Sequence, residues 1–274
     1  MLAALFERIQ LCIYDYFCTV LLAVLIGLIL GFIGGGGSIL AVPILVYVLR
    51  VDPVEATAYS LFVVGVASLF GAHKQYKLGN IDFKIGMMFA IPSFIGVFAV
   101  RRWVLPNIPD ELFVVGEYVL TKDIFLMVFF ALIMLLASLS MLYKRTVSKQ
   151  TKDIHQIKII TDGLLVGLIT GMVGAGGGFL IIPALVLLSG LEMKKAIGTS
   201  LMIIAVKSLF GFLGEWGSEI DWQLLMSFTA LAVIGIFAGV YLGRFFDGQK
   251  LKKSFGVFVL LMAVLIILKE FFII

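Results

Sequence analysis

Long apolar runs, separated by short polar loops, recur from one end of this chain to the other. About 20 consecutive apolar residues allow a helix to cross the roughly 30 Å hydrocarbon core of a bilayer. With 62% hydrophobic and 14% charged residues, the chain has too little polar surface for a soluble fold, in which about 25% of the residues are charged. We therefore expect an all-α integral membrane protein whose helices pack on one another within the bilayer.

An internal repeat divides the chain into two halves. Residues 27–71 align with residues 167–211 without a gap, which places GLILGFIGGGGSILAVPILV over GLITGMVGAGGGFLIIPALV. Composition alone does not place glycines and a proline in the same order twice. The alignment predicts three parts: an N-terminal repeat over residues 1–143, a cytoplasmic linker over 144–160 and a C-terminal repeat over 161–274.

Each half begins with a segment that glycines interrupt, over residues 17–49 and 160–189. A straight helix over the first segment would be about 50 Å long, which exceeds the roughly 30 Å of the hydrocarbon core. Because glycine and proline disfavour helix interiors, we expect each segment to fold back as two short helices. Three ordinary apolar stretches follow in each half, at residues 54–72, 85–105 and 122–143 and at residues 196–214, 222–243 and 254–272.

This count gives five membrane segments per half, and an odd number makes the halves enter the membrane from opposite sides. The expected fold is two inverted-topology repeats, each a broken-helix hairpin followed by three transmembrane helices. The loop charges agree, because most lysines then lie on one side, as cytoplasmic loops require. We expect a cell inner-membrane protein with both termini outside. The net charge of +4 thus reflects topology and not a nucleic-acid partner.

Broken helices in inverted repeats are typical of transporters, because unwound backbone is tolerated in a membrane only where it is buried or lines a cavity. The two breaks would approach one midplane pocket from opposite sides, with backbone N–H groups and helix N-termini that suit an anion. The alternative is that these glycines only allow close helix packing. The candidate substrate-binding residues at the breaks are Gly34, Gly35, Gly36, Gly37, Ser38, Gly174, Gly176, Gly177 and Gly178.

Polar side chains inside the apolar spans are costly unless they are paired or face a cavity. Ser60 and the pair Thr199 and Ser200 occupy equivalent positions, and their hydroxyls can donate either to a bound oxyanion or to their own helix carbonyls. Lys207, whose counterpart is Ala67, could lie on the solute path, pair with Glu215 or extend to the interface. We include Ser60, Thr199, Ser200 and Lys207 among the candidate substrate-binding residues.

The duplicated G-x-x-x-G-x-x-G-x-G-G run that ends in proline resembles the TauE/SafE-type sulfite exporters, also called the TSUP family. It spans Gly27 to Pro43 and Gly167 to Pro183. The resemblance covers nearly the whole chain and implies transport of small anions such as sulfite or sulfonates, as an exporter driven by the proton motive force. Lys207 and Tyr59 depart from the family pattern.

Three classes of function remain: a secondary transporter, a passive channel or facilitator, and a membrane enzyme or assembly subunit. An intramembrane enzyme would need clustered acids, bases or metal ligands, and the sequence has no such motif. Cys12 and Cys18 lack metal or redox spacing, so we expect no metal, cofactor or catalytic residue. The expected partners are a small anionic solute and the lipid bilayer, and the oligomeric state, including a homo-oligomer, stays open.

Overall fold

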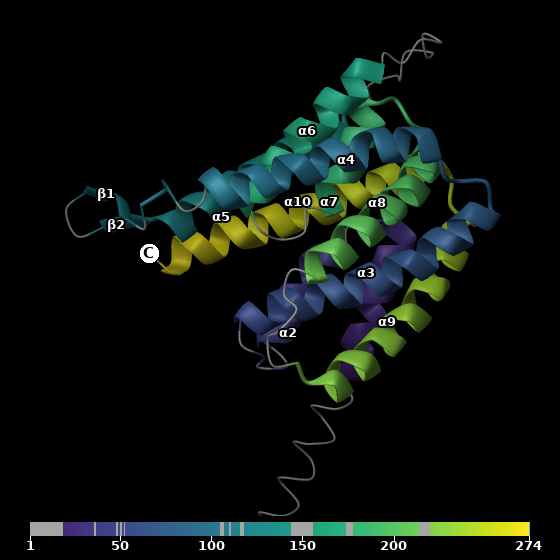
Figure 1. The fold of residues 1–274 in the computed structure, drawn as a ribbon, viewed down its shortest axis with the longest axis horizontal. Helices are drawn as coiled ribbons and strands as arrows, with labels where there is room; N and C mark the ends of the chain where they lie inside the picture. Colours follow the sequence, from purple (N-terminus) through teal and green to yellow (C-terminus); the bar gives the residue numbers. More distant parts are fainter. Residues whose placement is uncertain are drawn as a thin grey trace, which may run out of the picture.

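The structure is a computed structural model that describes residues 19–35, 37–47, 49, 51, 53–104, 107–109, 111–115, 118–143, 156–173, 178–213 and 220–273. In the N-terminal half a helix over Thr19–Ile33 is followed by α2 (Gly37–Tyr47), α3 (Pro53–Lys77), α4 (Phe83–Ala99) and α5 (Lys122–Leu142). The C-terminal half contains α6 (Gln156–Val173), α7 (Gly178–Pro183), α8 (Met193–Leu213), α9 (Trp222–Gly243) and α10 (Gly248–Ile273). These bounds match the apolar stretches expected from the sequence (Figure 1).

The described helices have the length and the surface of a membrane protein. Four of them are long and apolar enough to cross a bilayer, over Phe83–Val104, Met193–Leu213, Trp222–Gly243 and Gly248–Leu268. Large apolar side chains also point outward, and Ile91, Leu136, Ile234 and Leu261 are each more than half exposed. Such a surface suits hydrocarbon and not water. The expectation of a helical membrane protein is confirmed.

The all-α expectation is wrong in one loop. Two short antiparallel strands, β1 (Glu111–Val115) and β2 (Tyr118–Thr121), pair between α4 and α5. Their sequences, ELFVV and YVLT, are rich in the β-branched and aromatic residues that favour strands. Two π-helical turns were also not expected, one continuing α4 over Val100–Val104 and one continuing α7 over Ala184–Leu188.

The first Gly-interrupted segment reverses direction, as the sequence predicts. Gly34 ends the Thr19–Ile33 helix with a φ of 88°, a conformation that glycine adopts without steric cost. Gly37 then lies beside the carbonyl group of Ile26, whereas an unbroken helix would separate these two residues by about 16 Å. In the second half, α6 ends at Val173 and α7 begins at Gly178, and residues 174–177 between them lie outside the described part of the chain.

Equivalent helices of the two halves make equivalent contacts. The Thr19–Ile33 helix packs on α9 where Gly27 meets the backbone of Ala232, and α6 packs on α4 where Gly167 meets the backbone of Ser93. Small residues allow such backbone contacts between membrane helices. Gly27 and Gly167 thus allow close helix packing at equivalent positions. The pairs α3 with α8, α5 with α10 and α2 with α7 each join equivalent helices.

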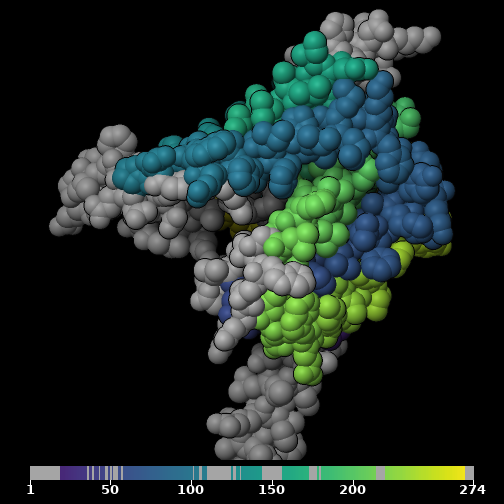
Figure 2. All heavy atoms as spheres, in the orientation of Figure 1, coloured from purple at the N-terminus to yellow at the C-terminus, as the bar shows by residue number. Residues whose placement is uncertain are grey.

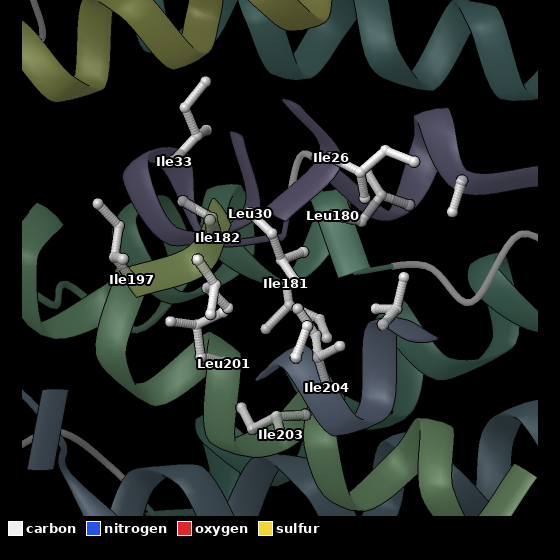
Figure 3. Packing of buried hydrophobic residues seen from close by; sticks show 14 of the residues in the cluster. Ile26, Leu30, Ile33, Leu180, Ile181, Ile182, Ile197, Leu201, Ile203 and Ile204 are labelled. Atoms are coloured by element: carbon white, nitrogen blue, oxygen red, sulfur yellow. The ribbon is translucent and has the colours of Figure 1, made fainter. Parts of the chain in front are cut away.

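The core of the molecule surrounds the two hairpins. Figure 3 shows Leu30 of the Thr19–Ile33 helix near Ile181 of α7 and Leu201 and Ile204 of α8, all of them buried. On the face seen in Figure 2, α8 lies between α4 and α9. Part of each broken segment is therefore in the interior of the protein, whereas Leu21 and Leu165, on the first helix of each segment, are more than half exposed on the outer surface.

Candidate functional site

Described residues that flank or belong to the two Gly-rich breaks lie close together in the structure. A Cβ atom added at Gly178, the first residue of α7, would lie 2.7 Å from Ser38 Oγ and 3.3 Å from the carbonyl oxygen of Gly35. One added at Gly34 would lie 2.9 Å from the hydroxyl oxygen of Ser200 on α8. The structure thus brings together five of the predicted site residues, from elements that are distant in the sequence.

Ser38 and Gly178 occupy the same position in the two repeats, and they contact each other. The local pseudo-twofold axis that relates the two halves therefore passes through this contact. Because the Ser38 hydroxyl already fills the space beside Gly178, the contact accommodates one side chain and not two. We call the set formed by Gly34, Gly35, Ser38, Gly178 and Ser200 the hairpin-tip cluster.

The polar groups of this cluster make local hydrogen bonds. The Ser38 hydroxyl donates to the Gly35 carbonyl at 2.7 Å, and the Ser200 hydroxyl donates to the Ile197 carbonyl at 2.9 Å. These bonds to nearby carbonyls are the alternative that the sequence left open for serine. A solute bound here would accept hydrogen bonds from these two hydroxyl groups only after each hydroxyl rotates away from its carbonyl.

The remaining predicted glycines are placed less fully. Gly37 packs against Leu30 of the preceding helix, where an added Cβ would lie 2.9 Å from the Leu30 Cβ. The predictions at Gly36, Gly174, Gly176 and Gly177 fall outside the residues that the structure describes.

Thr199 and Ser60 have different surroundings. The Thr199 hydroxyl oxygen accepts from the backbone N–H of Asp82 at 3.0 Å, so this side chain faces the loop before α4. Ser60 is buried on α3, at the position equivalent to Ser200. Among the contacts described, neither side chain reaches the hairpin-tip cluster.

Tyr59 was noted in the sequence only as a departure from the family pattern, yet it makes the counterpart of the Thr199 contact. Its hydroxyl oxygen accepts from the backbone N–H of Asp221 at 2.7 Å. Residues 59 and 199 are equivalent in the two repeats, and so are Asp82 and Asp221. Asp82 caps α4 and Asp221 caps α9, so these two bonds tie the start of one helix in each half to the opposite half.

Lys207 lies on the same face of α8 as Ser200. Residues 200, 204 and 207 are spaced by four and three, which places them on one helical stripe. Ile204 contacts the Gly178 position, and the Lys207 ammonium group donates to the Thr170 hydroxyl on α6 at 3.1 Å. The rise of α8 separates Lys207 from Ser200 by about 10 Å along the helix axis.

Thr170 is a polar residue that the sequence did not single out. It is buried, its hydroxyl also donates to the Gly167 carbonyl at 3.2 Å, and its counterpart in the first half is Leu30. The sequence alone does not indicate a role for a single threonine in an apolar helix, because the residue that packs against it is not known. Glu215, the partner considered for Lys207 from the sequence, lies outside the described residues.

Comparison with known proteins assigns this architecture to a family. Residues 19–269 match the sequence profile described as "Sulfite exporter TauE/SafE". Among curated proteins, the chain is 29% identical over 253 residues to a "Probable membrane transporter protein" of Xylella fastidiosa, covering 89% of this chain and 91% of that protein. A protein of Haemophilus influenzae with the same description is 28% identical over 279 residues, covering 92% of this chain and 100% of that protein. No solved structure matches.

Proposed function

This chain belongs to the sulfite exporter TauE/SafE family, and from that membership we propose that it is a secondary transporter that exports small sulfur-containing or organic anions such as sulfite or sulfonates. Its relatives are described as membrane transporters, so it is a multi-pass membrane transporter and not an enzyme. The contact between Ser38 and Gly178 is the observation that carries the site proposal, because it joins the tips of two equivalent broken segments. The proton motive force is the proposed energy source.

The transport mechanism is alternating access between two inverted repeats that meet at the hairpin-tip cluster. Equivalent helices α3 and α8 run antiparallel, because Asp82 after α3 bonds near the start of α8 while Tyr59 near the start of α3 bonds to Asp221 after α8. An antiparallel arrangement of equivalent helices supports opposite membrane orientations of the halves. Rocking of one half against the other would then expose the tips first to one side and then to the other.

The proposed substrate at the hairpin-tip cluster is an anion. Ser38 and Ser200 supply hydroxyl donors, and α2 begins at Gly37 with the positive end of its dipole toward the tips. Lys207 supplies positive charge on the same face of α8 as Ser200. From the residues predicted in the sequence, the proposed substrate-binding residues are Gly34, Gly35, Ser38, Gly178, Ser200 and Lys207, and Thr170 is the residue that positions Lys207.

The proposed orientation places the linker over residues 144–160 in the cytoplasm and both termini outside, with repeats over 1–143 and 161–274. Single cysteines at positions 111 and 149, in a Cys12→Ser and Cys18→Ser background, test it. A membrane-impermeant thiol reagent added to intact cells should label Glu111→Cys and spare Lys149→Cys, because only the first would face outward. Labelling of both positions from one side contradicts the inverted arrangement.

Binding of the substrate class can be measured on the purified protein. A ligand that binds only the folded state at 100 times its Kd raises the free energy of unfolding by about 2.7 kcal/mol. We expect sulfite, thiosulfate or a short alkyl sulfonate to raise the melting temperature in a concentration-dependent way, while chloride at equal ionic strength does not. A protein that none of these anions stabilises would contradict the substrate assignment.

A further inference from the structure

A cavity of about 180 Å³ opens on the side of the molecule where α3 ends and α8 begins. The Thr19–Ile33 helix contributes Gly31 and α8 contributes Ile197, while the turn after α3 and the end of α9 form other parts of the wall. This volume is far larger than one water molecule needs and smaller than the roughly 300–1,000 Å³ of pockets for drug-sized ligands. The cavity therefore fits a solute of a few heavy atoms together with some of its water.

The polar lining of this cavity is rich in hydrogen-bond donors. Two of its lining residues, Lys194 and Arg244, are cationic, and two, Gln75 and Asn80, carry amides. Gln75 is buried, and its Oε1 atom accepts from the Asn80 Nδ2 group at 2.8 Å. This bond leaves the Gln75 NH₂ group as a donor. No carboxylate is among the lining residues that the structure describes.

Helix electrostatics distinguish the two cations. Arg244 follows the last residue of α9, where a positive charge stabilises the helix dipole. Lys194 is in the first turn of α8, a turn that contains no acidic residue, and a positive charge there opposes the dipole. The dipole therefore does not favour Lys194, although Glu192 directly before α8 supplies a negative charge at the same helix end. A bound anion would be attracted by both the lysine and the helix N-terminus.

The inner end of the cavity lies next to the hairpin-tip cluster. Gly31 and Ile197 each precede a member of that cluster, Gly34 and Ser200 respectively, by three residues, which is about one helical turn. The Ile197 Cα atom would lie 3.4 Å from a Cβ added at Gly34. A solute in the cavity is thus about one turn away from the proposed binding position.

The repeat places different residues at the Lys194 and Asn80 positions on the opposite side. Lys194 aligns with Val54 in the first half, and Asn80 aligns with Glu219 in the second half. The opposite side thus has an apolar residue in place of the Lys194 cation, and a carboxylate in place of the Asn80 amide. The opposite side has Arg101 where this side has Val240, so the two faces differ in where their charges lie and not in whether they carry a cation. The loop charges assign the Lys194 side to the cytoplasm.

We propose that this cavity is an anion-capture vestibule, in which Lys194, Arg244, Gln75 and Asn80 bind a compact oxyanion from the cytoplasmic side before it reaches the hairpin tips. The inference deepens the proposed function and rests on it, since it gives the cytoplasmic face a site for the proposed substrate. A vestibule that concentrates anions on the cytoplasmic face favours export.

The local potential of the vestibule can be measured without transport. We choose Leu78→Cys as the reporter, since Leu78 lines the cavity and is half-buried, in a background lacking Cys12 and Cys18. The ratio of its reaction rates with an anionic and a cationic methanethiosulfonate should fall by roughly tenfold when Lys194→Gln and Arg244→Gln are combined. The control combines Lys195→Gln with Lys250→Gln, which removes the same charge from exposed residues outside the cavity lining. An equal fall in the control, or no fall in the double variant, overturns the vestibule.

Transport measured from each face separates this proposal from the function itself. In vesicles of opposite orientation, Lys194→Gln with Arg244→Gln should raise the KM for sulfite or methanesulfonate about tenfold from the cytoplasmic face and leave the KM from the other face unchanged. Equal changes on both faces, or none, contradict the vestibule. A wild-type protein that moves neither anion contradicts the proposed function, and in that case the thiol-reagent ratio still decides whether the cavity attracts anions.

Discussion

Gly178→Ser is expected to lower the transport rate at least tenfold while the protein still inserts in the membrane. The added Cβ would lie 2.7 Å from Ser38 Oγ and 3.0 Å from Ile204 Cδ1, so a second hydroxyl enters space that holds one. Overpacking of this kind typically costs about 1–3 kcal/mol of stability. This is enough to hold the hairpin tips apart or to restrict their relative motion. Transport into vesicles, normalised to the amount of inserted protein, gives the measurement.

A second substitution should restore the transport that Gly178→Ser loses, because the two halves are related by pseudo-symmetry. Ser38→Gly combined with Gly178→Ser moves the hydroxyl from one repeat to the equivalent position of the other, so the contact again holds one side chain. This double variant should regain most of the transport that Gly178→Ser loses. Gly211→Ser is the matched control, because a Cβ there would lie 3.5 Å from Leu61, at ordinary van der Waals distance. Loss of insertion or melting temperature in Gly178→Ser, without a specific loss of transport, would instead mean that these glycines serve packing alone.

Lys207→Ala is expected to weaken substrate affinity at least tenfold, which is a loss of about 1.4 kcal/mol in binding free energy. The free energy of unfolding, followed by the melting temperature, should fall by less than this amount. The ammonium group donates to Thr170 on α6 and lies on the α8 face that carries Ser200. Lys207 is half-buried, and a positive charge that is partly shielded from water attracts an anion more strongly than one in bulk water. Lys207→Arg should restore part of the affinity, since it keeps the charge but needs different room.

Three further variants interpret that result. Lys207→Gln keeps a hydrogen-bond donor for Thr170 but removes the charge, so it should behave like Lys207→Ala in affinity. Thr170→Val should give a smaller loss, because it removes a positioning partner and keeps the charge. Lys252→Ala, on α10, removes a lysine outside the proposed path. If affinity is unchanged in all the Lys207 variants, the side chain lies at an interface and not in the site.

The sequence predicted the membrane segments well for simple physical reasons. Hydrocarbon thickness fixes the length of a span, and a glycine run cannot continue a helix over about 50 Å, so the fold-back at Gly34 follows from chain length and backbone chemistry. The strands over Glu111–Val115 and Tyr118–Thr121 were missed because a short loop pairing depends on local turn geometry and not on membrane periodicity.

The internal repeat predicted part of the candidate site. Symmetry pointed to Ser38, Gly178 and Ser200, which the structure brings together. Thr199 was grouped with Ser200 because they are adjacent, but neighbouring helical residues face different directions, and Thr199 bonds to the Asp82 backbone. The vestibule could not be foreseen, because Gln75, Lys194 and Arg244 come from three elements whose meeting depends on the packing of the halves.

Counterflow in proteoliposomes tests the central claim, that this chain is a carrier with alternating access. Vesicles loaded with unlabelled sulfite or methanesulfonate and diluted into a trace of the labelled anion should accumulate label transiently above its equilibrium level, because each return step of a carrier brings a labelled molecule inward. Gly178→Ser should abolish this overshoot. A channel equilibrates the label without an overshoot, because its conduction has no return step. Monotonic uptake by the wild-type protein would therefore contradict the account.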